Sequence, residues 1–87
     1  MEGSRVSSPH DELIRAISSW SVTAGDGLRH DTSLIASGRL DSTVLFQLLF
    51  WVEERVGRLI DVTAIDMRAE WDTIDAIVEY IERERRS

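Results

Sequence analysis

The sequence predicts a small all-α domain, and three observations lead to this fold class. Apolar residues recur at the spacing of one helical face in three segments, near residues 9–21, 42–56 and 72–82. Residues typical of helix starts stand before each segment, and no segment shows the alternation of a half-buried strand. The 87 residues suit one domain, and a hydrophobic content of 43% is enough for a packed core. We therefore expect a small four-helix bundle with a long loop between its first two helices and a short third helix.

The first helix is predicted at residues 9–21. Ser8 and Asp11 have the spacing of a capping box, and Pro9 stands at the first helical position, where its missing N–H removes no hydrogen bond. Apolar side chains then recur on one face: Leu13, Ile14, Ile17 and Trp20. This face is expected to pack into the core.

Two segments are expected to lie outside the helices. Residues 1–7 are polar and are expected to form a flexible leader, so the domain is placed at residues 8–84. Residues 22–41 form a long connection rich in Gly, Asp, Ser and Thr. Loops of this length are unusual in a compact domain, so the connection needs anchors of its own. Leu34 and Ile35 are its candidates.

The second helix is predicted at residues 42–56. Asp41 and Ser42 stand at its start, and Gly57 can adopt the left-handed conformation that commonly ends a helix. At about 100° per residue, five apolar side chains point in similar directions. They form the expected core-facing stripe: Leu45, Leu48, Leu49, Val52 and Val56.

Two further helices complete the predicted bundle. A short helix is expected at residues 63–67, with Thr63 as its cap. The last helix is expected to begin near Asp72 and Thr73. Its apolar stripe consists of Ile74, Ile77, Val78 and Ile81.

Ser42 has two interpretations. A serine before an apolar helix is usually an N-cap that accepts a backbone hydrogen bond. A helix start also favours phosphate, because its first N–H groups are unpaired and the helix dipole is positive there. The run G-x-L-D-S at residues 38–42, with helical segments on both sides, resembles the acyl carrier protein family. Residues 31–35 before this motif and residues 71–74 at the entry to the last helix are also similar to that family, and the resemblance covers residues 8–82.

The resemblance implies a carrier function without enzymatic activity of its own. It implies that Ser42 bears a covalent 4′-phosphopantetheine arm, on which a biosynthetic intermediate is held as a thioester. A phosphopantetheinyl transferase would attach the arm from coenzyme A with Mg²⁺. A loading synthetase or acyltransferase and downstream enzymes would then be the other partners. Asp41 is expected to support the site, either as the helix cap or through a contact with the transferase.

The outward face of the second helix is the expected partner surface, because partner enzymes grip this helix in carrier proteins. Its candidates, together with one residue of the preceding turn, are Arg39, Thr43, Val44, Gln47, Phe50, Trp51 and Glu54. Neighbouring aromatic side chains that point outward need a partner or another segment of the chain to cover them. Fatty-acid carriers place acidic residues along this face, whereas this chain has Val44 and Gln47 there. We therefore expect a carrier for specialised metabolism, such as polyketide or nonribosomal peptide biosynthesis.

Charge and composition argue against several other function classes. The net charge is −6, and residues 31–79 hold ten acidic residues against four arginines, which disfavours nucleic acid and anionic membranes as partners. No apolar stretch approaches the roughly 18 residues that span a bilayer, and the first residues lack the apolar core of a signal peptide. A cytoplasmic monomer is therefore expected. Cysteine is absent, and His10 and His30 are far apart in the sequence, so no metal site is predicted.

Three alternatives stay open. The chain could be a primary carrier of fatty-acid synthesis, or a carrier fold that is never modified. It could also be an unrelated helical protein-interaction module in which Asp41 and Ser42 only cap a helix. A discrete carrier is favoured over a domain of a larger synthase. The cargo is not determined by the sequence, because the loading enzyme selects it.

Overall fold

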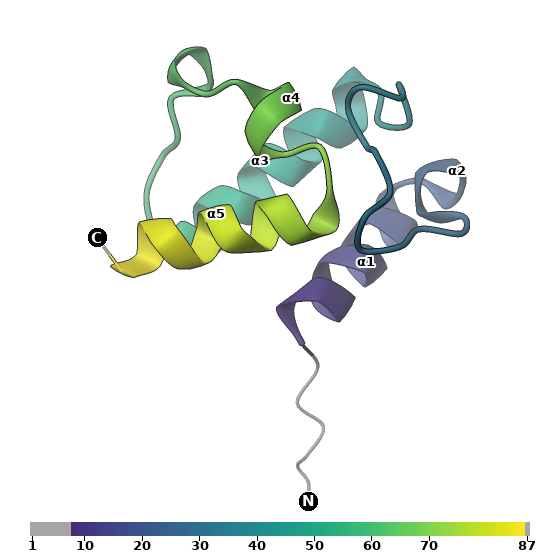
Figure 1. Cartoon of the computed structure of the whole chain (residues 1–87), viewed down its shortest axis with the longest axis horizontal. Coiled ribbons are helices and arrows are strands. Elements are labelled where there is room, and N and C mark those ends of the chain that lie inside the picture. Colours follow the sequence, from purple (N-terminus) through teal and green to yellow (C-terminus); the bar gives the residue numbers. More distant parts are fainter. Residues whose placement is uncertain (1–7, 87) are drawn as a thin grey trace, which may run out of the picture.

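The computed structural model describes residues 8–86, which form helices joined by loops, without a strand in this part of the chain (Figure 1). In chain order the elements are α1 (Pro9–Trp20), α2 (Val22–Gly25), α3 (Ser42–Val56), the 3₁₀ turn η1 (Val62–Ala64), α4 (Met67–Glu70) and α5 (Ile74–Arg86). The all-α prediction is confirmed. The predicted leader, residues 1–7, lies outside the described residues.

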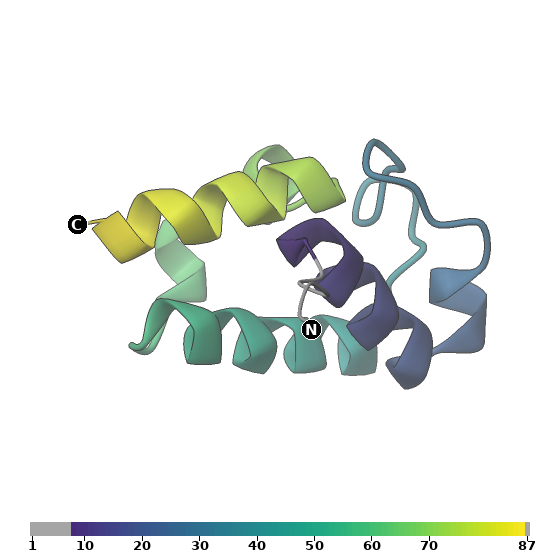
Figure 2. The ribbon, with the colours of Figure 1, turned by 90° about the horizontal axis from the view of Figure 1, so that it is seen from below.

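The core lies between the three long helices, which contact one another pairwise. Figure 2 shows α3 and α5 as two layers, with the start of α1 between them. The most deeply buried side chains come from these helices and from two positions outside them: Leu13, Ile17, Leu34, Leu48, Val52, Trp71, Ile74 and Ile77. The apolar faces predicted for the first and last helices are therefore confirmed.

The predicted helix ends are confirmed where a single local residue sets them. The hydroxyl of Ser8 accepts a hydrogen bond of 3.1 Å from the Asp11 N–H, which caps α1. Gly57 ends α3 with a left-handed φ of 88°. The hydroxyl of Thr73 accepts a hydrogen bond of 3.0 Å from the Ala76 N–H at the start of α5.

The segment between α3 and α5 differs from the prediction. Instead of one helix at residues 63–67, it contains two separate turns, η1 and α4. Thr63 is not the cap, because the Asp61 carboxylate accepts hydrogen bonds from the N–H and the hydroxyl of Thr63. Asp66 in turn caps α4. The two aspartates each begin a short turn and so divide the predicted helix.

The long connection is shorter than predicted, because its first residues form the extra helix α2. The Ser21 hydroxyl accepts a hydrogen bond of 3.1 Å from the Ala24 N–H and caps this turn. Farther along, Leu34 is fully buried and Ile35 packs against the core, as expected for anchors.

Asp72, just before α5, holds the middle of the long connection. Its carboxylate accepts hydrogen bonds from the main-chain N–H groups of Ile35 and Ala36 at 2.8 and 2.9 Å, and from the Ser33 hydroxyl at 3.0 Å. Its carbonyl accepts a further bond from the Leu34 N–H. These donors, the Ala36 N–H first, hold the pKa of the Asp72 carboxyl below its usual value, although burial opposes the shift.

Candidate functional site

Ser42 is the first residue of α3, and its side chain is exposed. The cap of this helix is Asp41: its carboxylate accepts a hydrogen bond of 2.9 Å from the Val44 N–H, and its carbonyl accepts one from the Leu45 N–H. The cap interpretation therefore belongs to Asp41 and not to Ser42. The Ser42 hydroxyl is left at the positive end of a 15-residue helix.

The turn before Ser42 is fixed by main-chain geometry. Gly38 has a φ of 77°, a left-handed conformation that side chains rarely adopt. The Leu40 N–H donates to the Leu34 carbonyl at 3.1 Å, and the Leu40 side chain is buried. Because Asp72 holds the neighbouring loop residues, the serine turn is linked to the start of α5.

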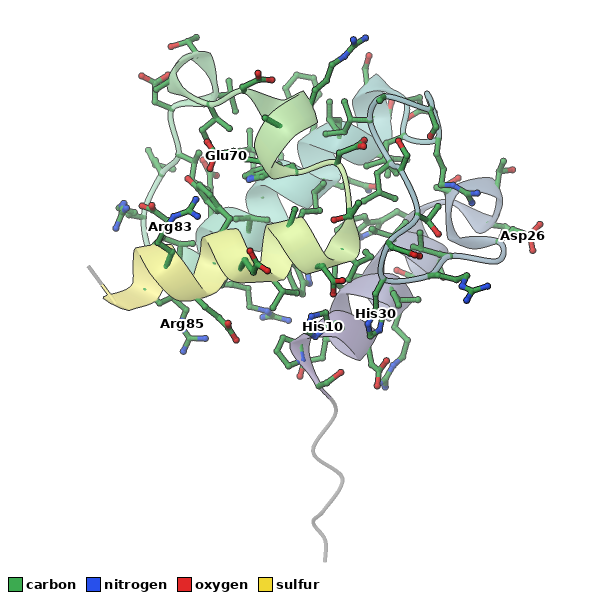
Figure 3. All side chains as sticks on the ribbon, in the orientation of Figure 1. His10, Asp26, His30, Glu70, Arg83 and Arg85 are labelled. Atoms are coloured by element: carbon green, nitrogen blue, oxygen red, sulfur yellow. The ribbon has the colours of Figure 1, made fainter. Side chains whose placement is uncertain are left out.

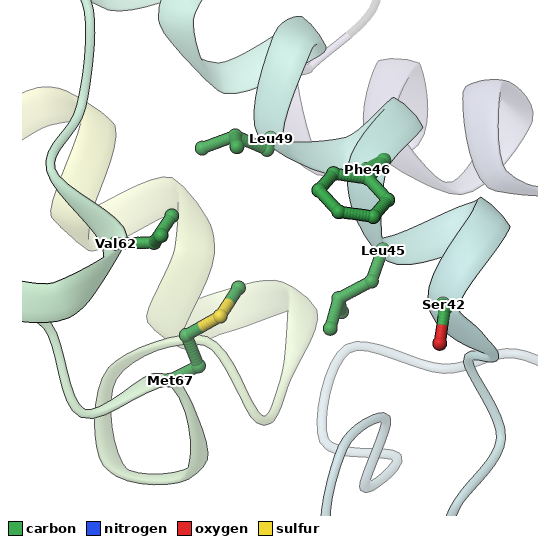
Figure 4. Close-up of a pocket in the computed structure, with 6 residues that line it drawn as sticks. All are labelled: Ser42, Leu45, Phe46, Leu49, Val62 and Met67. Carbon is green, nitrogen blue, oxygen red and sulfur yellow. The ribbon is translucent and has the colours of Figure 1, made fainter.

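An apolar pocket of about 250 Å³ lies beside Ser42 (Figure 4). Its walls come from α3, η1 and α4: Ser42, Leu45, Phe46, Leu49, Val62 and Met67. Leu45 and Leu49 are only half-buried because they face this pocket, whereas Leu48 and Val52 of the same predicted stripe are fully buried. An apolar segment of a ligand could lie here next to the serine.

The predicted partner residues do not form one surface. Thr43, Gln47, Phe50 and Glu54 are exposed on α3, and the Phe50 side chain is 63% exposed. The prediction that Val44 belongs to the partner surface is wrong. Its side chain is buried, because it projects from the first turn of α3 into the core. It cannot contact a partner in this conformation.

Arg39 and Trp51 are both engaged within the chain. The Arg39 guanidinium donates to the carbonyls of Ala24 and Asp26 at 3.3 and 2.8 Å, so it ties the serine turn to the end of α2. Trp51 is half-buried against the core, and the Arg55 guanidinium lies 4.3 Å from its ring centroid. Phe50 is thus the more exposed of the two predicted aromatic residues.

Phe46 was not predicted as a surface residue, yet it is 62% exposed and also lines the pocket beside Ser42. It lies one helical turn before Phe50 on α3, so the two rings share a side of the helix. The spacing of four residues between Phe46 and Phe50 is the sequence feature that could have indicated this pair.

The sequence did not predict a second group of polar side chains, formed by His10, His30 and Asp75. His10 at the start of α1 stacks on His30 of the long connection, with ring centroids 4.7 Å apart (Figure 3). Nε2 of His10 and Nδ1 of His30 lie 3.1 and 3.8 Å from the same Asp75 carboxylate oxygen. The sequence spacing gave no sign of this group, because the fold brings together residues that are distant in the sequence.

The chain matches no protein-family model, no curated protein and no solved structure. Among the helices of residues 8–86, none is long and apolar enough to cross a membrane.

Proposed function

We propose that the chain is a carrier protein that holds a biosynthetic intermediate on a 4′-phosphopantetheine group attached to Ser42. In this proposal, α1, α3, α4 and α5 correspond to the four helices of an acyl carrier protein, with α2 as an addition in the long connection. The observation that carries the proposal is the division of roles at the start of α3. Asp41 caps the helix, and Ser42 keeps an exposed hydroxyl.

The surroundings of Ser42 fit this group in two respects. The first turn of α3 offers main-chain N–H groups and the positive end of the helix dipole to a phosphodiester. The adjoining pocket is lined mainly by apolar side chains of Leu45, Leu49 and Met67, which suit an apolar acyl segment. When bound, the group supplies a thiol that carries the intermediate as a thioester.

The role of this chain in its own modification is to present a nucleophile. The Ser42 oxygen would attack the β-phosphate of coenzyme A and lose its proton to a transferase. Adenosine 3′,5′-bisphosphate would leave. Mg²⁺ and the base would come from the transferase. Asp41 acts as a positioning residue, because its bond to the Val44 N–H fixes the first turn and thereby the direction of the serine.

The outward side of α3 favours a partner that makes apolar contacts. Phe46 and Phe50 are both more than 60% exposed there. The Glu53 carboxylate accepts a hydrogen bond of 2.9 Å from the Ile60 N–H, which leaves Glu54 as the exposed acid of this stretch. A surface of this kind supports a dedicated partner of specialised metabolism over the basic patches of fatty-acid synthesis enzymes.

The test is the intact mass of the chain after incubation with coenzyme A, Mg²⁺ and a broad-specificity phosphopantetheinyl transferase. We expect one phosphopantetheine on the wild type and none on Ser42→Ala. Thr43→Ala is the matched control for the attachment site, since Thr43 is an exposed hydroxyl residue on the same helical turn. Its end point should still be one phosphopantetheine, and loss of this expected partner residue can change only the rate. Ser42→Ala should keep its fold, because Asp41 provides the cap.

Two outcomes would overturn the carrier proposal. One is a folded wild-type chain that gains no mass, and the other is a mass gain that persists in Ser42→Ala. The first outcome would favour the second candidate, an unmodified helical interaction module, for which the exposed Phe46 and Phe50 are the supporting observation. The second outcome would show that the group is attached to a residue other than Ser42.

A further inference from the structure

The group formed by His10, His30 and Asp75 has the composition of a metal site. It brings two imidazole nitrogens and one carboxylate oxygen within 4.8 Å of one another. Two imidazoles with a carboxylate are ligands that suit zinc and the neighbouring transition metals better than Mg²⁺ or Ca²⁺. Three protein ligands leave further coordination positions for water.

The three donors come from separate elements that the fold holds together. His10 lies in the first turn of α1, and Asp75 lies in the first turn of α5. His30 is fixed by its main chain, because its carbonyl accepts a hydrogen bond of 3.1 Å from the Asp75 N–H. This bond keeps His30 beside Asp75 whatever its side chain does.

Binding of one ion requires the side chains to move closer and the two imidazoles to turn out of their stack, because nearly parallel rings do not point their nitrogen lone pairs at one ion. Ligand atoms around tetrahedral zinc, with bonds of about 2.0–2.1 Å, lie roughly 3.3 Å apart. His10 and Asp75 already meet this spacing at 3.1 Å, whereas the Asp75 oxygen and His30 must close from 3.8 Å. The His30 and Asp75 side chains are 51% and 52% exposed, so their outer atoms have room to rotate.

The charge beside the group is suitable for a cation. An open hollow next to it is lined by Arg29, Asp31, His30 and Asp75 among its polar residues. Two carboxylates and one guanidinium leave this hollow negative when the imidazoles are neutral, which is the form that binds metal.

We propose that His10, His30 and Asp75 bind one divalent transition-metal ion of the zinc class and so tie α1, the long connection and α5 together. The proposal does not depend on the modification of Ser42. Its physical consequence is a more stable fold, because an ion that binds only the folded chain shifts the folding equilibrium.

The test titrates Zn²⁺ into the full chain without a polyhistidine tag, followed by calorimetry and by the imidazole NMR signals. The chain has only two histidines, so both signals can be assigned and followed. We expect one equivalent of Zn²⁺ and movement of both signals. The melting temperature should rise by about 10 °C or more at a concentration roughly a hundred times Kd.

Single variants should separate this site from general binding to acidic residues. His10→Gln, His30→Gln and Asp75→Asn should each weaken Zn²⁺ binding by about tenfold or more. Glu79→Gln is the matched control for Asp75→Asn, since Glu79 is an exposed acid one turn farther along α5, and it should change Kd by less than about twofold. Circular dichroism verifies the fold of each variant, and His30→Gln keeps the main-chain bond to Asp75 intact.

Three results would overturn the proposal: no one-equivalent binding event, binding that survives both histidine variants, or equal weakening by Glu79→Gln. Any of them would reduce the group to a hydrogen-bonded stack of two imidazoles on a carboxylate.

Discussion

Replacement of Asp72 should loosen the loop that leads to the serine. Asp72→Ala removes the acceptor of three hydrogen bonds, from Ser33, Ile35 and Ala36. At about 1 kcal/mol for each bond, the expected loss of unfolding free energy is roughly 3 kcal/mol. For a domain of this size, that corresponds to a fall in melting temperature of about 12–24 °C.

Asp72→Asn removes the charge of the side chain and keeps an oxygen that can accept hydrogen bonds. Both main-chain N–H groups donate to the same oxygen, Oδ1, which asparagine retains, and the Ser33 hydroxyl can turn to suit the amide. We expect this variant to lose only about 1 kcal/mol, or roughly 4–8 °C.

Thermal unfolding at pH 7 followed by circular dichroism measures both variants. Amide hydrogen exchange then locates the effect: the Ile35 and Ala36 N–H groups should exchange faster in Asp72→Ala, while Leu48 in the core of α3 should change less. Equal losses in the two variants, or losses below about 1 kcal/mol in both, would refute the role assigned to these hydrogen bonds.

The same carboxylate predicts a dependence on pH. Because the folded pKa of Asp72 lies below its usual value, its contribution is complete above about pH 4 and is lost as the pH falls through the folded pKa. The pKa of Asp61 is lowered in the same direction by hydrogen bonds from Thr63. Asp72→Asn should therefore flatten the acid limb of the stability curve without abolishing it, as denaturant melts at several pH values would show.

Two further predictions concern packing and the outward face of α3. Gly25→Ala places a Cβ 2.6 Å from Ser18 Cα of α1, so it should destabilise the fold by about 1–3 kcal/mol. Gly38→Ala meets open space and should cost only the roughly 1 kcal/mol of its left-handed φ. Thermal melts of the two variants should show the larger loss of stability for Gly25→Ala. Phe50→Ala should leave stability within about 0.5 kcal/mol, because the ring is 63% exposed. Under the carrier proposal, the same variant should weaken binding to the enzyme that loads the carrier by about tenfold. Titration with that enzyme measures this, and unchanged affinity would remove Phe50 from the proposed partner surface.

The sequence by itself determined the elements whose ends depend on one residue. Pro9, Gly57 and Thr73 act on the backbone within a few positions of themselves, and the helices begin or end beside them as predicted. The apolar face of α5 follows for the same reason, because the helical period alone selects it. The sequence pattern did not show that Asp61 and Asp66 each cap a separate turn, so it predicted one helix capped by Thr63.

The candidate site was predicted only in part. Its serine and capping aspartate are neighbours in the sequence, so their places at the start of α3 could be inferred. Val44 and Trp51 could not be placed, because the angle at which α1 and α5 cross α3 decides which flanking positions are covered.

Only the tertiary structure decided which distant polar groups meet. Asp72 binds residues 36 to 39 positions earlier in the chain, and Asp75 meets His10 and His30 from two other elements. Periodicity and capping describe interactions within a few residues, whereas these contacts arise when the helices pack. Packing brought the two histidines onto one carboxylate, although neither has a partner near it in the sequence.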